Sequence, residues 1–212
     1  MVENSPMAEK KVILIDMYGV IIKESKGYFV PYTLEHFEKQ EHARIIRAIR
    51  EEQMFTRAGN GLLTSDEFLR YLGYKNPRES MVDYLENYLT PDEQFIPFAE
   101  NIRDKFDMVL LSNDVSEWSA YLTEYHRLNP YFQDKIVSGD VGMRKPEERI
   151  FRYALERLGR RPEECIFVDN SVKNLEAAEA LGIESVLFNR DGEEYSGTVV
   201  NDFVELEKVI LS

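Results

Sequence analysis

The sequence predicts an α/β protein in which a doubly wound parallel sheet carries a small helical domain inserted after its first strand. Five short apolar runs are near-continuous, which is typical of strands buried on both faces of a parallel sheet. Amphipathic helical patterns separate the later runs, whereas a much longer helical stretch separates the first two. The five runs are Val12–Ile15, Met108–Leu111, Ile136–Val137, Ile166–Val168 and Ser185–Phe188.

Two of the separating segments have clear helical patterns. Apolar residues at helical spacing form a stripe between Ile150 and Leu158, with Pro146 before it and Gly159 after it. A second stripe runs from Val172 to Leu181 and ends at Gly182. Strands that alternate with helices in this way indicate right-handed crossovers and a doubly wound sheet.

The stretch between the first two strands is too long for a single crossover connection. It contains a charged helix with Ile45, Ile46 and Ile49 on one face, and a capping box at Thr64–Glu67 that begins another helix. We therefore predict a helical cap domain over residues 23–92. The α/β core then comprises residues 8–22 and 93–212, and residues 1–7 form a loose tail.

The composition narrows the possible partners. The 212 residues are 43% hydrophobic, which is enough for a folded core, and carry a net charge of −13. Such a charge argues against binding to nucleic acid or to an anionic membrane. A small-molecule substrate is expected, and an anionic one requires cations, helix N-termini or a metal placed locally. No sequence feature sets an oligomeric state.

The sequence also predicts the compartment. No apolar stretch approaches the length of a membrane span, and residues 1–10 lack the apolar region of a signal peptide. The single cysteine, Cys165, lies in an apolar run, so we expect a buried thiol and no internal disulfide. A cytoplasmic protein is expected.

Polar residues follow four of the predicted strands, at the sheet edge where ligands bind in open α/β folds. They are Asp16, Ser112, Lys145 and Asp169. A carboxylate in such a site can attack a phosphoryl or alkyl centre to form a covalent ester. A hydroxyl and a lysine can stabilise the transferred group, and a second carboxylate can share a cation such as Mg²⁺ with the first.

These segments, in this order, resemble the four motifs of the haloacid dehalogenase (HAD) superfamily. The stretches Gly142-x-x-Lys145-Pro146 and Val168-Asp169-Asn170-Ser171, with Asn174, are especially similar to subfamily I members that carry a helical cap. The resemblance covers residues 12–189. It implies a Rossmann-like HAD core and a hydrolase.

The resemblance implies a role for each motif residue. Asp16 would be the nucleophile, Ser112 would bind the transferring group, and Lys145 would orient and stabilise Asp16. Asp169 would ligate Mg²⁺, with Asp16 as a second ligand and Asn170 nearby. The backbone carbonyl of Tyr18 would be a further metal ligand.

Further substrate contacts are expected beside these motif residues. Asn113 follows Ser112 directly, and the Tyr18 side chain follows the nucleophile by two residues. In the predicted cap, Arg57 and the loop 59–64 are candidate contacts. The cap would close over the strand ends, exclude water and select the substrate.

Tyr18 is the main departure from the family pattern. Phosphatases of the family usually carry an aspartate there, which acts as general acid and base. A tyrosine has a pKa near ~10 against ~3.9 for aspartate, so it is a poor base near neutrality. General acid–base catalysis contributes ~10²–10⁴ in rate. The favoured hypothesis is therefore a Mg²⁺-dependent phosphatase of a small metabolite with a good leaving group.

Two alternatives stay open. The stretch Asp16-Met17-Tyr18-Gly19 resembles the first motif of metal-independent 2-haloacid dehalogenases. Their fourth motif, however, resembles Ser-x-Asn-x-x-Asp, whereas Asp169 stands here. A carboxylate at that position with no cation nearby would repel Asp16, although Lys145 weakens this argument. Because Tyr18 replaces the usual acid and base, a catalytically weak binding protein is the second alternative.

Overall fold

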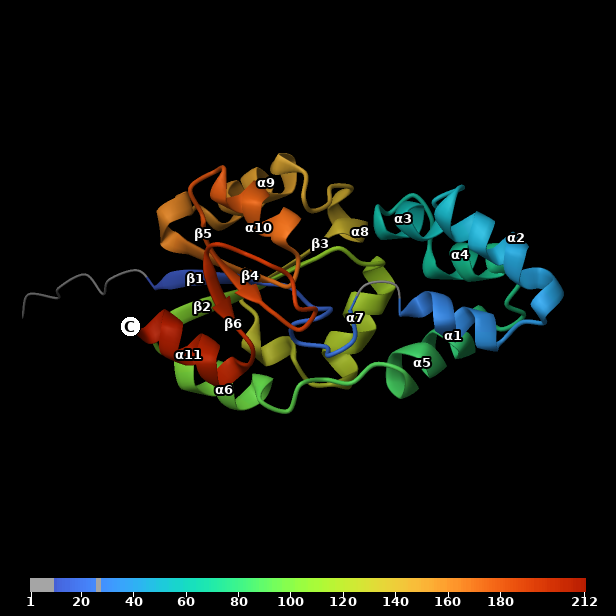
Figure 1. Cartoon of the computed structure of the whole chain (residues 1–212), viewed down its shortest axis with the longest axis horizontal. Coiled ribbons are helices and arrows are strands. Elements are labelled where there is room, and N and C mark those ends of the chain that lie inside the picture. Colours follow the sequence, from blue (N-terminus) through green and yellow to red (C-terminus); the bar gives the residue numbers. More distant parts are fainter. Residues whose placement is uncertain (1–9, 26–27) are drawn as a thin grey trace, which may run out of the picture.

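The computed structural model describes residues 10–25 and 28–212, and it contains the predicted parallel sheet. Six strands lie in the order β3-β2-β1-β4-β5-β6, and every neighbouring pair is parallel (Figure 1). The predicted tail 1–7 lies outside the described residues. The strands are β1 (Lys11–Ile15), β2 (Phe106–Ser112), β3 (Asp134–Val137), β4 (Cys165–Asp169), β5 (Glu184–Phe188) and β6 (Thr198–Val200).

The five apolar runs of the sequence correspond to β1–β5, so the predicted fold class is confirmed. Strand β6 was not predicted. It has three residues at the edge of the sheet, and Thr198 and Val199 are exposed while only Val200 is buried. A strand with one buried residue has no apolar run that a sequence pattern can detect.

Alternate residues of the central strand pack on opposite faces of the sheet. Val12 and Leu14 belong to the cluster formed with α9 (Glu148–Leu158) and α10 (Val172–Glu179). Ile13 and Ile15 belong to the cluster formed with α6 (Phe95–Ile102), α7 (Ser116–Tyr125) and α11 (Phe203–Leu211). Helices therefore cover both faces, as a doubly wound sheet requires.

The remaining helices of the described chain have these bounds. Five follow β1, namely α1 (Phe29–Glu35), α2 (Lys39–Arg50), α3 (Met54–Gly59), α4 (Ser65–Leu72) and α5 (Pro77–Asn87). The short α8 (Ser138–Val141) follows β3. Two 3₁₀ turns cover Asn129–Tyr131 and Pro162–Glu164.

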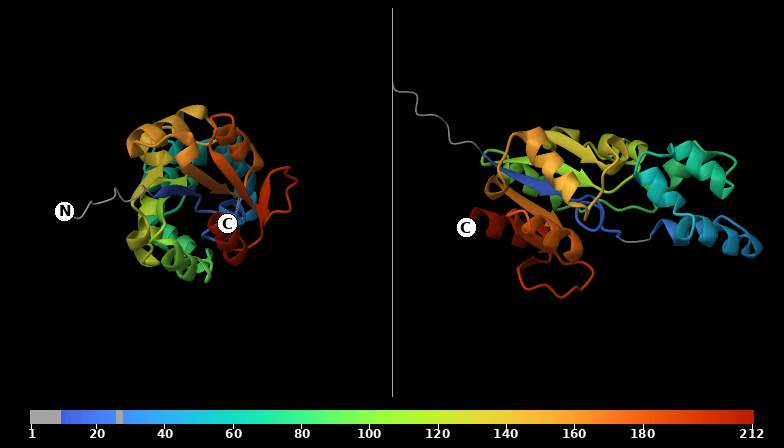
Figure 2. Two further views of the ribbon diagram at one scale, coloured as in Figure 1. Left: turned by 90° about the vertical axis from the view of Figure 1, so that its left-hand side faces the viewer. Right: turned by 90° about the horizontal axis from the view of Figure 1, so that it is seen from above.

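Helices α1–α5 lie together beyond the carboxyl ends of the strands (Figures 1 and 2). The predicted capping box begins α4, where Thr64 Oγ1 accepts from the Glu67 backbone N–H and Glu67 accepts from that of Thr64. None of the helices in the described part of the chain is long and apolar enough to cross a membrane. The division into core and cap domains stays a prediction.

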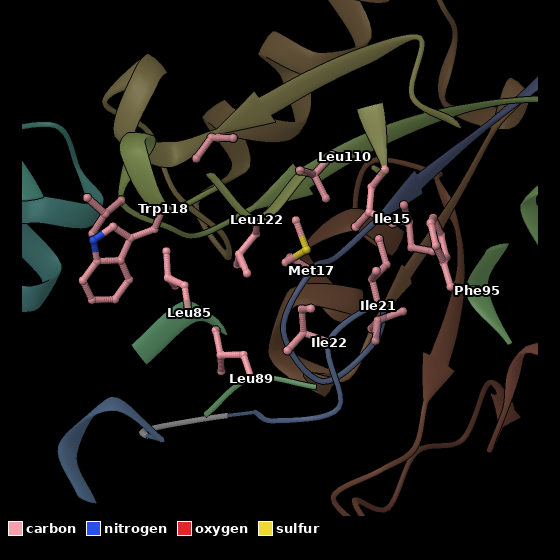
Figure 3. Packing of buried hydrophobic residues seen from close by; sticks show 14 of the residues in the cluster. Ile15, Met17, Ile21, Ile22, Leu85, Leu89, Phe95, Leu110, Trp118 and Leu122 are labelled. Carbon is pink, nitrogen blue, oxygen red and sulfur yellow. The ribbon is translucent and has the colours of Figure 1, made fainter. Parts of the chain in front are cut away.

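The two chain segments that connect these helices to the sheet run side by side. The Lys23 N–H donates to the Thr90 carbonyl at 2.8 Å, and the Asp92 N–H donates to the Ile21 carbonyl at 2.8 Å. Apolar packing continues across this junction, because Leu85 and Leu89 belong to the same buried cluster as Ile15 and Leu110 of the sheet (Figure 3). The helices are thus held over the strand ends by both backbone pairing and a shared core.

Candidate active site

Three of the four motif residues lie at the ends of neighbouring strands, and the fourth lies in a loop beside them. Asp16 follows β1, Ser112 ends β2, Asp169 ends β4, and Lys145 lies in the loop before α9. Because β2 and β4 pair with opposite sides of β1, their carboxyl ends meet around Asp16. The Asp16 N–H donates to the Val168 carbonyl at 3.0 Å, which ties the end of β1 to the end of β4.

The ammonium group of Lys145 lies between two carboxylates. Its Nζ is 2.8 Å from Asp16 Oδ1 and 2.7 Å from Asp169 Oδ2. The Lys145 side chain is 1% exposed and that of Asp169 is fully buried, so water screens these charges little. Burial opposes the charge on Lys145, but the two carboxylates outweigh it and raise the pKa of this lysine.

The two oxygens of Asp16 are in different environments. Oδ1 accepts hydrogen bonds from Lys145 Nζ and from the Met17 backbone N–H at 2.8 Å. Within the described residues, Oδ2 accepts none, and Asp16 lines the principal pocket. Burial raises the pKa of Asp16 to about 6, with Lys145 opposing and Asp169 adding to that shift. The side chain thus has one fixed oxygen and one available oxygen.

Asp169 is held by donors from its own segment. Its Oδ1 accepts from the Ser171 N–H at 2.8 Å, and both of its oxygens lie 3.1 Å from Asn174 Nδ2. Together with Lys145, these donors fix the carboxylate without a side chain from the helical segment. Asn174, which belongs to the family motif, thus helps to orient the Asp169 carboxylate.

Ser112 and Asn113 are adjacent but have different partners. Ser112 Oγ is buried and has no hydrogen-bond partner among the described residues. Asn113 pairs with the backbone of Lys145, because its Nδ2 donates to the Lys145 carbonyl and its Oδ1 accepts the Lys145 N–H, both at 2.8 Å. Asn113 therefore holds the Lys145 loop against β2. The Ser112 hydroxyl, in contrast, is not engaged by any described residue.

Tyr18 points toward a residue that the sequence analysis did not single out. Its Oη donates to Asp114 Oδ2 at 3.0 Å, and Ser119 Oγ donates to the same oxygen at 2.6 Å. Burial raises the pKa of Asp114 to about 7, although the hydrogen bonds from Ser119 and Tyr18 act to lower it. Burial, followed by the Asp114 charge, raises the pKa of Tyr18 well above its ordinary value. The only indication of Asp114 in the sequence was its position directly after Ser112-Asn113.

Asn170 packs against the turn that follows the predicted nucleophile. Its Nδ2 donates to Asp191 Oδ2 at 2.8 Å. A Cβ atom at Gly19 would lie 2.2 Å from this Nδ2, and Gly19 has a φ of +79°. Glycine is therefore required here both for the backbone conformation and for the close approach of Asn170.

A pocket of about 330 Å³ opens onto these strand ends. Its lining includes the predicted residues Asp16, Tyr18, Asn113, Lys145 and Asn170. Arg57 is not part of this lining, because its side chain is exposed on α3 with Nη1 3.8 Å from Met54 Sδ.

The same pocket is also lined by aromatic residues that the sequence did not indicate as part of the site. They include Phe29, Phe55, Tyr84 and Trp118. Arg144, which precedes Lys145, also reaches the pocket and was not singled out. No sequence signal distinguished these aromatic residues from ordinary core positions, since three of them are also buried.

The donor set around Lys145 fits Mg²⁺. Asp16 and Asp169 both contact one Nζ atom, so their carboxylates face a common point. Within the described chain, no group of three or more His, Cys, Asp or Glu side chains is arranged to hold a metal. Mg²⁺ nevertheless commonly uses one or two carboxylates and completes its shell with water and substrate phosphate. Asp16 and Asp169 supply two such carboxylates.

The α/β fold thus carries a carboxylate–lysine–carboxylate group at the edge where β1, β2 and β4 end. A family model described as haloacid dehalogenase-like hydrolase matches residues 10–182. The chain belongs to this family of hydrolases, and the predicted resemblance is confirmed.

Curated relatives include several phosphatases. The chain is 31% identical over 90 residues to a glyceraldehyde 3-phosphate phosphatase from Methanocaldococcus jannaschii, covering 39% of this chain and 40% of the relative. It is 25% identical over 186 residues to a D-ribitol-5-phosphate phosphatase from Bacteroides thetaiotaomicron, covering 82% and 90%. A drimenol cyclase from Aspergillus calidoustus is 46% identical over 90 residues, covering 42% of this chain but 15% of the cyclase. The chain thus matches 40% of the length of the glyceraldehyde 3-phosphate phosphatase and 15% of that of the cyclase.

The fold is also similar to solved structures. One is a HAD family enzyme from Bacteroides thetaiotaomicron in complex with magnesium and inorganic phosphate, with a TM-score of 0.73. It is 23% identical to this chain, and the match covers 89% of this chain and 98% of that enzyme. At this identity the similarity establishes the fold.

Proposed function

We propose that this protein is a Mg²⁺-dependent phosphatase of a small phosphorylated metabolite and that Asp16 is its nucleophile. The main support is the asymmetry of the Asp16 carboxylate. Lys145 and the Met17 N–H hold Oδ1, whereas Oδ2 is not engaged by any described residue. Several of the curated relatives are phosphatases, which favours phosphoryl transfer over other reactions of the family.

The proposed reaction has two steps. Asp16 Oδ2 attacks phosphorus, and the bond from phosphorus to the leaving oxygen breaks with its electron pair going to that oxygen. Water then attacks the aspartyl phosphate, releases inorganic phosphate and restores the Asp16 carboxylate. Ser112 Oγ is buried and lacks a partner among the described residues, so in this proposal it would donate to a phosphoryl oxygen, and Lys145 would offset negative charge.

A bound Mg²⁺ would neutralise phosphoryl charge, and Asp16, Asp169 and the Tyr18 carbonyl would hold it, with Asn170 nearby. The Bacteroides enzyme of similar fold was solved with magnesium and phosphate. The test is phosphate release from a panel of phosphomonoesters and acyl phosphates with Mg²⁺ and with chelator. We expect release that requires Mg²⁺ and that Asp16→Asn reduces by at least about 10³-fold. An inactive wild-type protein across the panel would refute the proposal.

The structure also favours a second candidate, a 2-haloacid dehalogenase. Lys145 Nζ lies between Asp16 and Asp169, so a cation already separates the two carboxylates and their proximity does not require a metal. Asp16 would then displace halide from carbon, and water would hydrolyse the resulting ester. Halide release from short 2-haloacids in the presence of chelator is the test. This candidate is eliminated if the wild-type protein releases no more halide than Asp16→Asn does.

A further inference from the structure

The pocket of about 330 Å³ described above is lined by two chemically different groups of residues. The first group comprises the charged residues of the described lining, namely Asp16, Arg144 and Lys145. The second comprises Phe29, Phe55, Tyr84 and Trp118, together with aliphatic residues. A ligand that fills a pocket of about 330 Å³ must therefore combine an anionic end with an apolar body.

The four aromatic side chains form one continuous wall, named here the aromatic wall. The Phe29 ring is stacked on that of Phe55, with centroids 5.6 Å apart, and lies 5.2 Å from the rings of both Tyr84 and Trp118. The ring centroids of Phe55 and Trp118 are 5.8 Å apart, so these two rings are also in contact with each other. Offset and edge-to-face contacts at such distances suit a further aromatic ring.

Five polar side chains around the pocket are already paired with protein groups, which disfavours a polyol as the ligand. Trp118 Nε1 donates to Ser65 Oγ at 2.7 Å, and Tyr18 Oη donates to Asp114. Three more pocket residues are paired with protein groups, namely Ser25 with Asp191, Asn113 with the Lys145 backbone and Asn174 with Asp169. Sugar hydroxyls buried in this pocket would lose hydrogen bonds to water without replacements from these side chains.

The cationic side chains that line the pocket can bind the anionic end of such a ligand. Arg144 Nη1 is buried and has no hydrogen-bond partner among the described residues. Burial lowers the pKa of Arg144, yet a guanidinium remains charged near neutrality. A phosphoryl group at Asp16 would lie beside Lys145, whose Nζ is 2.8 Å from Asp16 Oδ1, in a pocket that Arg144 also lines.

From these observations we propose that the substrates of the site are aryl phosphates, whose ring contacts the aromatic wall while the phosphoryl group meets Asp16. This assignment rests on the phosphatase function proposed above. In the chemical step, Asp16 Oδ2 bonds to phosphorus, and the bond between phosphorus and the phenolic oxygen breaks to release a phenolate. The phenolate then takes a proton from water.

The hydrogen bond from Tyr18 to Asp114 supports the same class of substrate independently. The phenolic proton of Tyr18 is committed to Asp114, and no aspartate stands at that position to protonate a leaving group. Phenols ionise near pKa ~10, as tyrosine does, so an aryl phosphate releases its oxygen without such help. A simple alcohol is a far weaker acid and depends on a general acid.

The test separates ring recognition from catalysis by means of two non-hydrolysable ligands. Binding of phenylphosphonate and methylphosphonate to the full chain with Mg²⁺ is measured by calorimetry. We expect phenylphosphonate to bind at least about tenfold more tightly, which is equivalent to ~1.4 kcal/mol. Equal affinities would overturn the assignment, whether or not the protein shows turnover.

Two variants locate the preference. Phe55→Ala removes one half-buried ring from the aromatic wall and should reduce the tenfold preference to about twofold or less. Phe37→Ala removes a half-buried ring that does not line this pocket and should leave the preference unchanged. An undiminished preference in folded Phe55→Ala would show that the ring binds elsewhere and would overturn the proposal.

Hydrolysis assays distinguish a failure of this inference from a failure of the proposed function. Acetyl phosphate has no ring and a good leaving group, so its Mg²⁺-dependent, Asp16-dependent hydrolysis tests the function alone. Phenyl phosphate should then exceed glycerol 3-phosphate by at least about 100-fold in kcat/KM. If acetyl phosphate reacts and phenyl phosphate shows no advantage, the substrate class is wrong while the phosphatase stands.

Discussion

Tyr18 Oη donates a hydrogen bond to Asp114 Oδ2 at 3.0 Å, and this contact sets the chemistry of the position two residues after the nucleophile. The same oxygen of Asp114 accepts a hydrogen bond from Ser119 Oγ at 2.6 Å, and Asp114 is 2% exposed. Tyr18 is therefore fixed by a buried acceptor. Its hydroxyl is engaged within the protein, which supports the proposed preference for leaving groups that need no protonation.

This contact predicts that Tyr18→Asp will widen the range of leaving groups. A carboxyl at this position is a stronger acid than a phenol, and near neutrality it is also present in the ionised form that can accept a proton, which a phenol is not. We expect kcat for an alkyl phosphate such as glycerol 3-phosphate to rise by about 10²-fold or more, within the range of general acid–base catalysis. Turnover of phenyl phosphate should change by less than about tenfold.

Tyr18→Phe is the matched control, since it removes the hydroxyl and keeps the ring. It should leave the ratio of phenyl to alkyl phosphate turnover within about threefold of wild type. A large fall in aryl phosphate turnover in Tyr18→Phe would mean that the phenol itself transfers a proton. Steady-state kinetics with both substrates measures each outcome. Activity in Tyr18→Asp combined with an inactive wild type would instead favour the hypothesis of a catalytically weak binding protein.

Replacing Lys145 should cost stability as well as activity. The lysine is the common partner of two buried carboxylates, at 2.8 Å from Asp16 and 2.7 Å from Asp169. Removing one partner of a buried ion pair leaves an uncompensated charge and costs about 3–5 kcal/mol. Lys145→Met should therefore lower the free energy of unfolding by about that amount in urea denaturation.

The double variant Lys145→Met with Asp169→Asn provides the control for this explanation. Neutralising one carboxylate removes part of the repulsion, so the double variant should be more stable than Lys145→Met. If Lys145→Met unfolds within about 1 kcal/mol of wild type, the ion pairs do not stabilise the fold as argued. Mg²⁺ should stabilise Lys145→Met if Asp16 and Asp169 bind it, and this can be measured without any assay of activity.

The sequence predicted those parts of the site that follow from chain topology. Asp16, Ser112 and Asp169 end neighbouring parallel strands, so their convergence follows once the strands and their order of crossover are recognised. Motif spacing then located Lys145. The capping box at Thr64–Glu67 was predictable because it depends on residues three apart.

Features that depend on tertiary packing were not predictable in this way. The partner of Tyr18 is Asp114, which lies 96 residues away in the chain. Phe55 and Trp118 meet across the junction between the helical segment and the sheet, and their pattern in the sequence resembles that of any core position. Arg57 follows the helical pattern equally well, but its side chain is exposed outside the pocket.

The capping box of α4 should contribute measurable stability. Thr64 Oγ1 accepts from the Glu67 N–H at 3.2 Å, and Glu67 Oε2 accepts from the Thr64 N–H at 2.8 Å. Thr64→Ala should lower the free energy of unfolding by about 1 kcal/mol. Glu67→Gln keeps an acceptor for the Thr64 N–H and should have a smaller effect. Equal losses in both variants, measured by urea denaturation, would contradict this account of the cap.

The buried carboxyl of Asp114 should make stability depend on pH. Burial raises its pKa from 3.8 to about 7 in the folded state. Between these values the folded protein holds a proton that the unfolded chain releases, so the free energy of unfolding falls as pH rises. This contribution is complete below pH 3.8 and is lost as pH rises through about 7. Within the window the slope approaches ~1.4 kcal/mol per pH unit.

Asp114→Asn removes this titration while retaining a side chain that can accept hydrogen bonds. Asp16, with a pKa raised to about 6, titrates in the same window, so the informative quantity is the difference between variant and wild type. We expect Asp114→Asn to gain stability relative to wild type as pH rises from 5 to 8, measured by urea denaturation at each pH. Asp66→Asn, which alters an exposed carboxyl on α4, should show no such trend. Parallel pH curves for Asp114→Asn and wild type would mean that Asp114 does not bind a proton in the folded protein at pH 5.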